Sequence, residues 1–87
     1  MKDEEVLRTI KYLAEEDRYI LTLHAKERLV QRHLTDAELK DILLNPIRIV
    51  RRDAGPNGVV KYKIQGGTNN RKVAVVIEHN LIVITVM

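Results

Sequence analysis

The stretch Leu21-Thr-Leu-His-Ala-Lys-Glu-Arg-Leu-Val-Gln-Arg32 organises the chain, because a short apolar run passes there directly into a helical pattern. His24, Arg28 and Arg32 recur every four residues. At about 100° per residue, they lie along one side of a helix. Two arginines one turn apart repel each other by a few tenths of a kcal/mol unless an anion lies between them. We therefore interpret this row as the candidate functional site.

Upstream of this stretch, the pattern predicts an N-terminal helix and a short strand. The helix spans Asp3 to Asp17, and its acidic first turn suits the helix dipole. Tyr19 to Leu23 is a short apolar run that favours a strand. The predicted apolar stripe of the helix consists of Val6, Ile10, Leu13 and Ala14.

Downstream, Thr35 and Glu38 have the spacing of a capping box and start another helix, Asp36 to Leu44. Asn45-Pro46 ends this helix. Its residues predicted to face inward are Ala37, Leu39, Ile42 and Leu43. In the preceding helix, Ala25 and Leu29 form the stripe that can face the core.

From Ile47 the apolar pattern has a period of two, which is typical of strands. The predicted strands are Ile47 to Arg52, Val59 to Gln65, Arg71 to Glu78 and Leu81 to Met87. In the first, alternation places Ile47 and Ile49 on one face and Arg48, Val50 and Arg52 on the other. The last two are almost continuously apolar, so we expect them at the centre of the sheet, with Ile77 and Ile84 in the core.

These elements predict an α+β fold in which three N-terminal helices pack on one face of a four-stranded antiparallel sheet. With 87 residues and no linker-like run, the chain is expected to form a single domain, residues 1–87. Within it, residues 1–18 form an acidic N-terminal helix and residues 19–87 form the core.

The composition favours a polyanionic partner. Met1 to Asp17 contains three basic and six acidic residues, whereas the remainder carries a net charge of +6. The chain has no cysteine, so neither disulfides nor thiolate metal sites hold the fold together. Because no leader-like or membrane-spanning segment is visible, we expect a soluble cytoplasmic protein.

Several segments together resemble one known family. They are the stretch quoted above, the Asn-Pro after the following helix, Val60-Lys-Tyr-Lys-Ile-Gln-Gly66, Arg71-Lys-Val-Ala-Val-Val76 and Val83-Ile-Thr-Val86. The chain is similar over nearly all of its length from Tyr19 to the domain of unknown function numbered forty-two fifty-eight. That family is placed with the barnase, EndoU, colicin and RelE (BECR) group of small ribonuclease toxins. The resemblance implies a RelE-like fold.

The resemblance also implies a set of catalytic residues, namely His24, Arg28 and Arg32 in the helix and Tyr62, Arg71 and Thr85 in the sheet. One departure concerns His33, which stands where the family often has glycine. A helix that ends in a left-handed residue there is more costly in this chain.

The residue types fit metal-independent RNA cleavage. Such cleavage requires a base for the 2'-hydroxyl, an acid for the departing 5'-oxygen, and fixed positive charge at the phosphate. An imidazole near a helix N-terminus and beside two guanidinium groups should favour its neutral form, which suits His24 as the base. Arginine can grip two phosphate oxygens at once. Candidates for the acid are Tyr62, Arg71 and Lys72.

Each of these residues also has a structural interpretation. His24 can cap its helix or lie half-buried. The arginines can pair with nearby carboxylates on a solvated surface. Tyr62 lies on the apolar face of its strand and can pack in the core, and Thr85 is an ordinary strand former.

A second basic set suits the phosphate backbone of RNA, although it can also serve solubility alone. It consists of Arg48, Arg51, Arg52, Lys61, Lys63 and Lys72. The three histidines have no ligand-type spacing, so we expect no metal and no cofactor.

The sequence thus predicts a toxin-like endoribonuclease with RNA as its substrate and an antitoxin protein as its partner. The alternative is a non-catalytic nucleic-acid-binding or protein-interaction module on the same fold.

Overall fold

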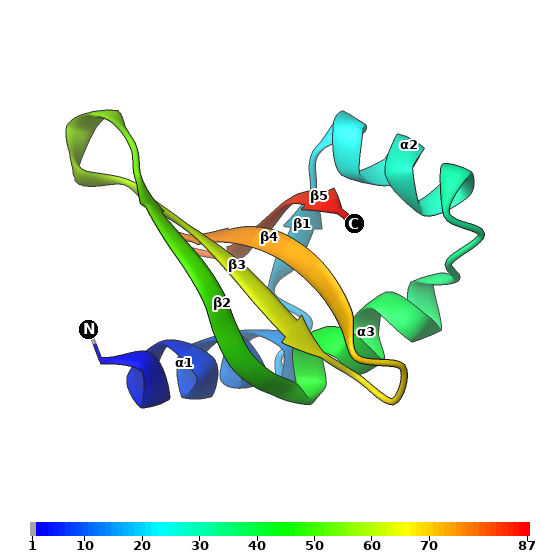
Figure 1. Cartoon of the computed structure of the whole chain (residues 1–87), viewed down its shortest axis with the longest axis horizontal. Coiled ribbons are helices and arrows are strands. Elements are labelled where there is room, and N and C mark those ends of the chain that lie inside the picture. Colours follow the sequence, from blue (N-terminus) through cyan, green and yellow to red (C-terminus); the bar gives the residue numbers. More distant parts are fainter. Residues whose placement is uncertain (1) are drawn as a thin grey trace.

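Within the residues that the structure describes, the sheet contains five strands, and three α-helices accompany it (Figure 1). The computed structural model describes residues 2–87. In chain order the elements are α1 (Asp3–Glu15), β1 (Tyr19–Leu21), α2 (Leu23–Gln31), α3 (Asp36–Leu44), β2 (Pro46–Ala54), the 3-10 helix η1 (Pro56–Gly58), β3 (Val60–Gly66), β4 (Arg71–Ile77) and β5 (Leu81–Val86). The predicted α+β class and the three helices are confirmed.

The prediction of a four-stranded antiparallel sheet is wrong in its strand count and in one strand direction. The strand order is β1-β5-β4-β3-β2, and β1 pairs in parallel with β5. The other neighbours are antiparallel. The apolar run from Tyr19 does form a strand, but only the pairing of Tyr19 with Leu81 and of Leu21 with Val83 gives it a place in the sheet. Such long-range pairing cannot be read from a three-residue run.

The core lies between one face of the sheet and the helices α1 and α3, which run below the sheet in Figure 1. The predicted stripe of α1 is confirmed, because all four of its residues are buried. In α3 the prediction holds for Leu39, Ile42 and Leu43, but Ala37 is exposed. At about 100° per residue, Ala37 lies roughly opposite the mean direction of those three residues. Ile77 is partly buried and packs against the core.

An irregularity in β2 changes which side chains share a face. Ile49 pairs with Ile64, and Arg52 pairs with Tyr62, with a register shift between Ile49 and Arg51. Because Ile64 and Tyr62 are two residues apart in β3, Ile49 and Arg52 lie on the same, helix-covered face. The predicted separation of Arg52 from Ile49 is therefore wrong, since one extra residue in a strand reverses the alternation beyond it.

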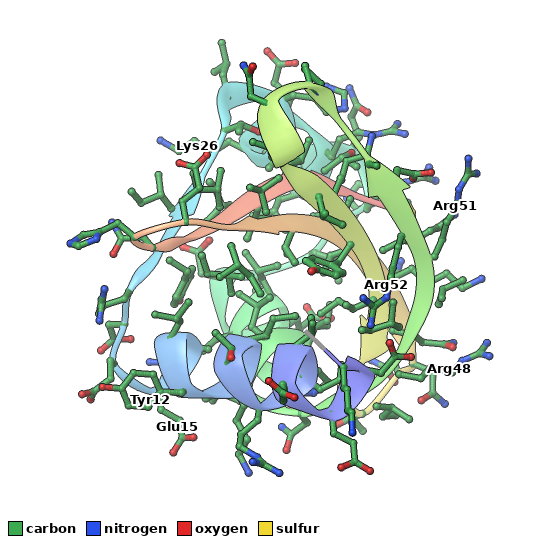
Figure 2. All side chains as sticks on the ribbon, turned by 90° about the vertical axis from the view of Figure 1, so that its left-hand side faces the viewer. Tyr12, Glu15, Lys26, Arg48, Arg51 and Arg52 are labelled. Atoms are coloured by element: carbon green, nitrogen blue, oxygen red, sulfur yellow. The ribbon has the colours of Figure 1, made fainter. Side chains whose placement is uncertain are left out.

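Arg52 is consequently directed toward the N-terminal helix. Its guanidinium forms an ion pair with Asp3 of α1 and lies 5.5 Å from the centroid of the Tyr62 ring. Figure 2 shows Arg48 and Arg51 pointing outward from β2, whereas Arg52 turns inward above α1. Arg52 thus belongs to the packing between α1 and the sheet, apart from the other predicted RNA-binding residues.

A second irregularity lies in β5. Ala74 pairs with Thr85 and Val75 pairs with Val83, so Ile84 is an extra residue between the two pairs. Ile84 is half-buried and lines a shallow groove on the face opposite α1 and α3. The prediction of Ile84 as a core residue is therefore wrong, because Ile84 follows the core residue Val83 and so lies on the opposite face.

The turn between β3 and β4 packs against the end of α3. A side chain at Gly66 would meet the backbone oxygen of Asn45 at 2.5 Å, so only glycine fits this close approach. The Asp41 carboxylate accepts hydrogen bonds from the Thr68 backbone N–H (2.8 Å) and from Asn45 Nδ2 (2.9 Å). These bonds, chiefly the one from Thr68, hold the pKa of Asp41 below its ordinary 3.8.

His33 ends α2 in the left-handed conformation, with a φ of 55°. Its backbone N–H donates to the Val30 carbonyl, and the Leu34 N–H donates to the Leu29 carbonyl at 2.9 Å. This pair of bonds is the Schellman arrangement, in which glycine is the usual residue at the His33 position. His33 therefore has a side chain in the left-handed conformation that glycine adopts more readily.

Candidate functional site

Helix α2 is fixed to the sheet by Thr22, the residue immediately before it. The Thr22 N–H donates to the Val83 carbonyl (3.1 Å), and its hydroxyl donates to the Ile84 carbonyl (3.0 Å). The same hydroxyl oxygen accepts the Ala25 N–H at 3.1 Å and so caps the helix. The first turn of α2 is therefore held directly on β5, where β1 ends.

The predicted row of His24, Arg28 and Arg32 lies on this helix. His24 is exposed in the first turn, Arg28 is half-buried, and Arg32 is the exposed residue that follows the last turn. Within residues 2–87, neither arginine forms an ion pair with a carboxylate, and Arg28 Nη1 donates only to Gln31 Oε1 at 3.3 Å. The row is thus not neutralised by neighbouring acidic residues.

Two buried polar atoms distinguish the junction of α2 and β5. Arg28 Nε and Thr85 Oγ1 are the only buried side-chain nitrogen or oxygen atoms of residues 2–87 that have no hydrogen-bond partner in the protein. They belong to two elements that pack against each other. Buried polar atoms in folded proteins are nearly always paired, so each of these two marks a position where a water molecule, an ion or a ligand supplies the missing partner.

The sheet face away from α1 and α3 is strongly basic. Strand register places Arg51, Lys63, Ala74 and Thr85 in one row across four strands. The neighbouring rows add the other cations of this face. We call the set the basic face, and it consists of Arg48, Arg51, Lys61, Lys63 and Lys72.

One carboxylate, Asp53, shares the basic face. It pairs in register with Lys61, and its Oδ1 accepts a hydrogen bond from Arg51 Nε at 2.8 Å. Arg48 Nε donates to the neutral Gln65 at 2.8 Å. Positive charge therefore dominates this face. The row of residues across the sheet ends at Thr85, next to the junction of α2 and β5.

The structure separates the three candidates for the general acid. Tyr62 is 8% exposed and lies in the core, on the helix-covered face. Arg71 begins β4 on that same face, where it pairs with Gly66. Lys72 lies on the basic face, diagonal to Thr85, because Ala74 is the residue opposite Thr85. Of the three, Lys72 is thus the one that shares a face with Thr85.

Sequence reasoning missed Thr22, which was included in a strand extending to Leu23. A threonine directly before a helical pattern is a typical N-cap, and this signal could have ended the strand at Leu21. Its bond to the Ile84 carbonyl, by contrast, follows from tertiary packing and has no local signal.

Residues 2–87 contain no group of three or more His, Asp or Glu side chains arranged to hold a metal ion. Across the same residues, every helix falls short of the length and hydropathy needed to cross a bilayer.

The comparisons with known proteins give one match. A family model described as Domain of unknown function (DUF4258) matches residues 21–87, which include every candidate site residue but not α1. No curated protein and no solved structure was found to match the chain.

Proposed function

The chain belongs to the family described as Domain of unknown function (DUF4258), and we propose that it is a toxin-like, metal-independent endoribonuclease. In this proposal the family shares its ancestry with the BECR ribonuclease toxins, and the active site lies where α2 meets β5. The observation that carries the proposal is the pair of buried, unpartnered polar atoms, Arg28 Nε and Thr85 Oγ1. Both are hydrogen-bond donors, and a phosphate offers the acceptors that they lack.

The basic face supports RNA as the substrate. Its five cations follow the sheet surface toward Thr85, so a phosphate backbone lying along them would lead into the α2 junction. The chain has three tyrosines and no tryptophan or phenylalanine, which leaves few platforms for base stacking. We therefore expect binding through phosphates and weak preference for sequence.

The proposed reaction is a transesterification. His24 takes the proton of the 2'-hydroxyl, and O2' attacks the adjacent phosphorus. The bond between phosphorus and O5' breaks, and O5' receives a proton from the Lys72 ammonium. The products are a 2',3'-cyclic phosphate and a 5'-hydroxyl.

Arg28 supplies the fixed positive charge for this reaction. Its planar guanidinium can donate to two non-bridging oxygens as negative charge develops on them. The Thr85 hydroxyl adds a neutral donor from β5, and the exposed Arg32 suits a flanking phosphate. Because side chains supply the base, the acid and the positive charge, the proposed mechanism requires no metal ion.

An unrestrained ribonuclease would damage the RNA of its own cell. The proposal therefore includes a cognate antitoxin protein that keeps RNA from the α2 junction.

One observation favours the non-catalytic alternative. The described residues include no hydrogen-bond partner for the His24 ring, whereas a catalytic base is commonly oriented by a second group. A binding module would need the basic face alone. The two functions therefore differ in whether His24 matters.

His24→Ala tests this difference. Removal of a general base typically costs 10²- to 10⁴-fold in rate, so we expect cleavage of single-stranded RNA to fall by about that factor. The matched control is His79→Ala, which removes an exposed imidazole from the turn between β4 and β5 and should cleave like the parent. The assay is run with EDTA, and the 3' ends of the products are identified.

Cyclic phosphate ends, persistence in EDTA and loss of activity only in His24→Ala are the expected results. If the parent leaves RNA intact while still binding it, the non-catalytic module replaces the ribonuclease.

A further inference from the structure

Helix α2 exposes two large apolar side chains on its outer side. Leu23 is 73% exposed and Val30 is 75% exposed, the highest values among the large hydrophobic residues of the described chain. They are seven residues apart, so they lie on one stripe only about 20° out of line. Exposing both to water is unfavourable, and the stripe is directed away from the core residues Ala25 and Leu29.

Lys26 and Glu27 lie between these two residues on the same side of the helix. Read in chain order, the stripe is apolar, basic, acidic, apolar. Read from the opposite end, it is apolar, acidic, basic, apolar. The stripe is therefore complementary to an antiparallel copy of itself, because Leu23 meets Val30 and Lys26 meets Glu27 on both sides of a two-fold axis.

A groove beside α2 provides a place for the apolar contact. It has a volume of about 620 Å³ and is lined mainly by apolar side chains, including Val30, Leu29, Leu34, Tyr19 and Leu21. Lys26 also lines it. In an antiparallel pair, Leu23 of the second copy would arrive next to Val30, at the margin of this groove. Each copy thus offers both a projecting leucine and the hollow that receives it.

We propose that the chain forms a two-fold symmetric homodimer through the outer stripe of α2, which consists of Leu23, Lys26, Glu27 and Val30. Two antiparallel helices packed in this way bury both apolar residues of each copy and satisfy two charge pairs. Because two short helices make a small interface, the dimer should dissociate on dilution. The inference does not depend on the proposed ribonuclease function.

The dimer is compatible with the candidate site. At about 100° per residue, Arg28 is turned roughly 140° from Leu23 around the helix axis, so the Arg28 side chain stays outside the interface. Figure 2 places Lys26 on the opposite side of the molecule from Arg48 and Arg51. The basic face therefore also remains open in the dimer.

A charge-exchange experiment tests this arrangement. Sedimentation velocity of the parent over increasing concentration should show a shift from monomer to dimer. In a homodimer of Lys26→Glu, or of Glu27→Lys, both pairs between residue 26 of one copy and residue 27 of the other bring like charges together. Each variant should therefore self-associate at least about tenfold more weakly than the parent. An equimolar mixture of the two variants restores both charge pairs and should form heterodimers as readily as the parent forms homodimers.

The controls keep the result interpretable. Lys11→Glu and Glu15→Lys make the same charge changes on exposed positions of α1 and should associate like the parent. Circular dichroism establishes that each variant is folded, and Leu23→Asp should abolish association without a charge swap. A parent that stays monomeric at millimolar concentration overturns the proposal, as does a mixture that associates no better than its separate components.

Discussion

At the scale of single residues, the start of α2 is stabilised by hydrogen bonds, whereas its end contains a strained residue. At its start, the Thr22 hydroxyl caps the helix, and two hydrogen bonds from the Thr22 N–H and hydroxyl attach it to β5. At its end, His33 adopts a left-handed conformation that costs an L-residue with a side chain about 1–2 kcal/mol. Arg28 thus lies in a helix whose first turn is fixed to the sheet by Thr22 and whose end is followed by the strained residue His33.

Replacing His33 by glycine should stabilise the protein. Glycine relieves the left-handed strain but adds entropy to the unfolded chain, so we expect a net gain of about 0.5–1 kcal/mol in the free energy of unfolding. Urea titration measures it. The control His24→Gly places glycine inside the same helix and should instead destabilise by roughly 1 kcal/mol. Equal effects of the two changes would contradict the assigned helix end.

At the scale of elements, the apolar periodicity predicted where most helices and strands lie. It did not predict, for every strand, which side chains lie on which face of the sheet. The stripe of α1 could be predicted because helical spacing is set locally. The bulges in β2 and β5 could not, because an extra residue is defined only against the partner strand. Arg52 was misplaced for this reason.

Two isoleucine-to-alanine substitutions on opposite faces of the sheet test the assignment of Ile84 to the face away from the core. Ile64 is fully buried against the helices, so Ile64→Ala should lower the free energy of unfolding by about 2–5 kcal/mol. Ile84 is half-buried on the other face, so Ile84→Ala should cost less than about 1.5 kcal/mol. Urea unfolding of both variants gives the comparison. Similar losses would mean that Ile84 belongs to the core after all.

At the scale of the whole molecule, charge is divided between the two faces of the sheet. Acidic residues concentrate in α1, which covers one face, whereas Arg48, Arg51 and three lysines occupy the other. Such a division favours approach of a polyanion from one side only. The sequence showed the imbalance between the N-terminal helix and the remainder, but the side on which each cation lies required the strand register.

The salt dependence of RNA binding should distinguish the two adjacent arginines of β2. Arg51→Ala removes a proposed phosphate contact and should flatten the log-log slope of affinity against salt by about 0.7 for single-stranded RNA. Arg52→Ala changes a cation that pairs with Asp3 on the opposite face, so it should leave the slope unchanged. Fluorescence anisotropy at several salt concentrations measures both. A slope altered equally by the two changes would refute the assignment of the basic face.

The candidate site was only partly predictable, because local spacing can be read from the sequence whereas packing between distant segments cannot. The spacing of His24, Arg28 and Arg32 is local and placed them along one helix, with Arg32 as its C-cap. The relation of Arg28 to Thr85 depends on packing between α2 and β5, which are distant in the sequence. Tyr62 and Lys72 are both polar residues of neighbouring strands, and only the register shows that they lie on different faces.

The central claim, that Arg28 acts on a scissile phosphate at the α2 junction, is tested most directly by Arg28→Lys. Lysine keeps the charge but loses the planar, bidentate grip. Cleavage of single-stranded RNA should therefore fall by roughly 10²-fold, while RNA affinity and melting temperature stay near those of the parent. Arg8→Lys, the same change at an exposed position of α1, is the matched control and should cleave normally. If Arg28→Lys cleaves as fast as the parent and the control, the junction of α2 and β5 is not the active site.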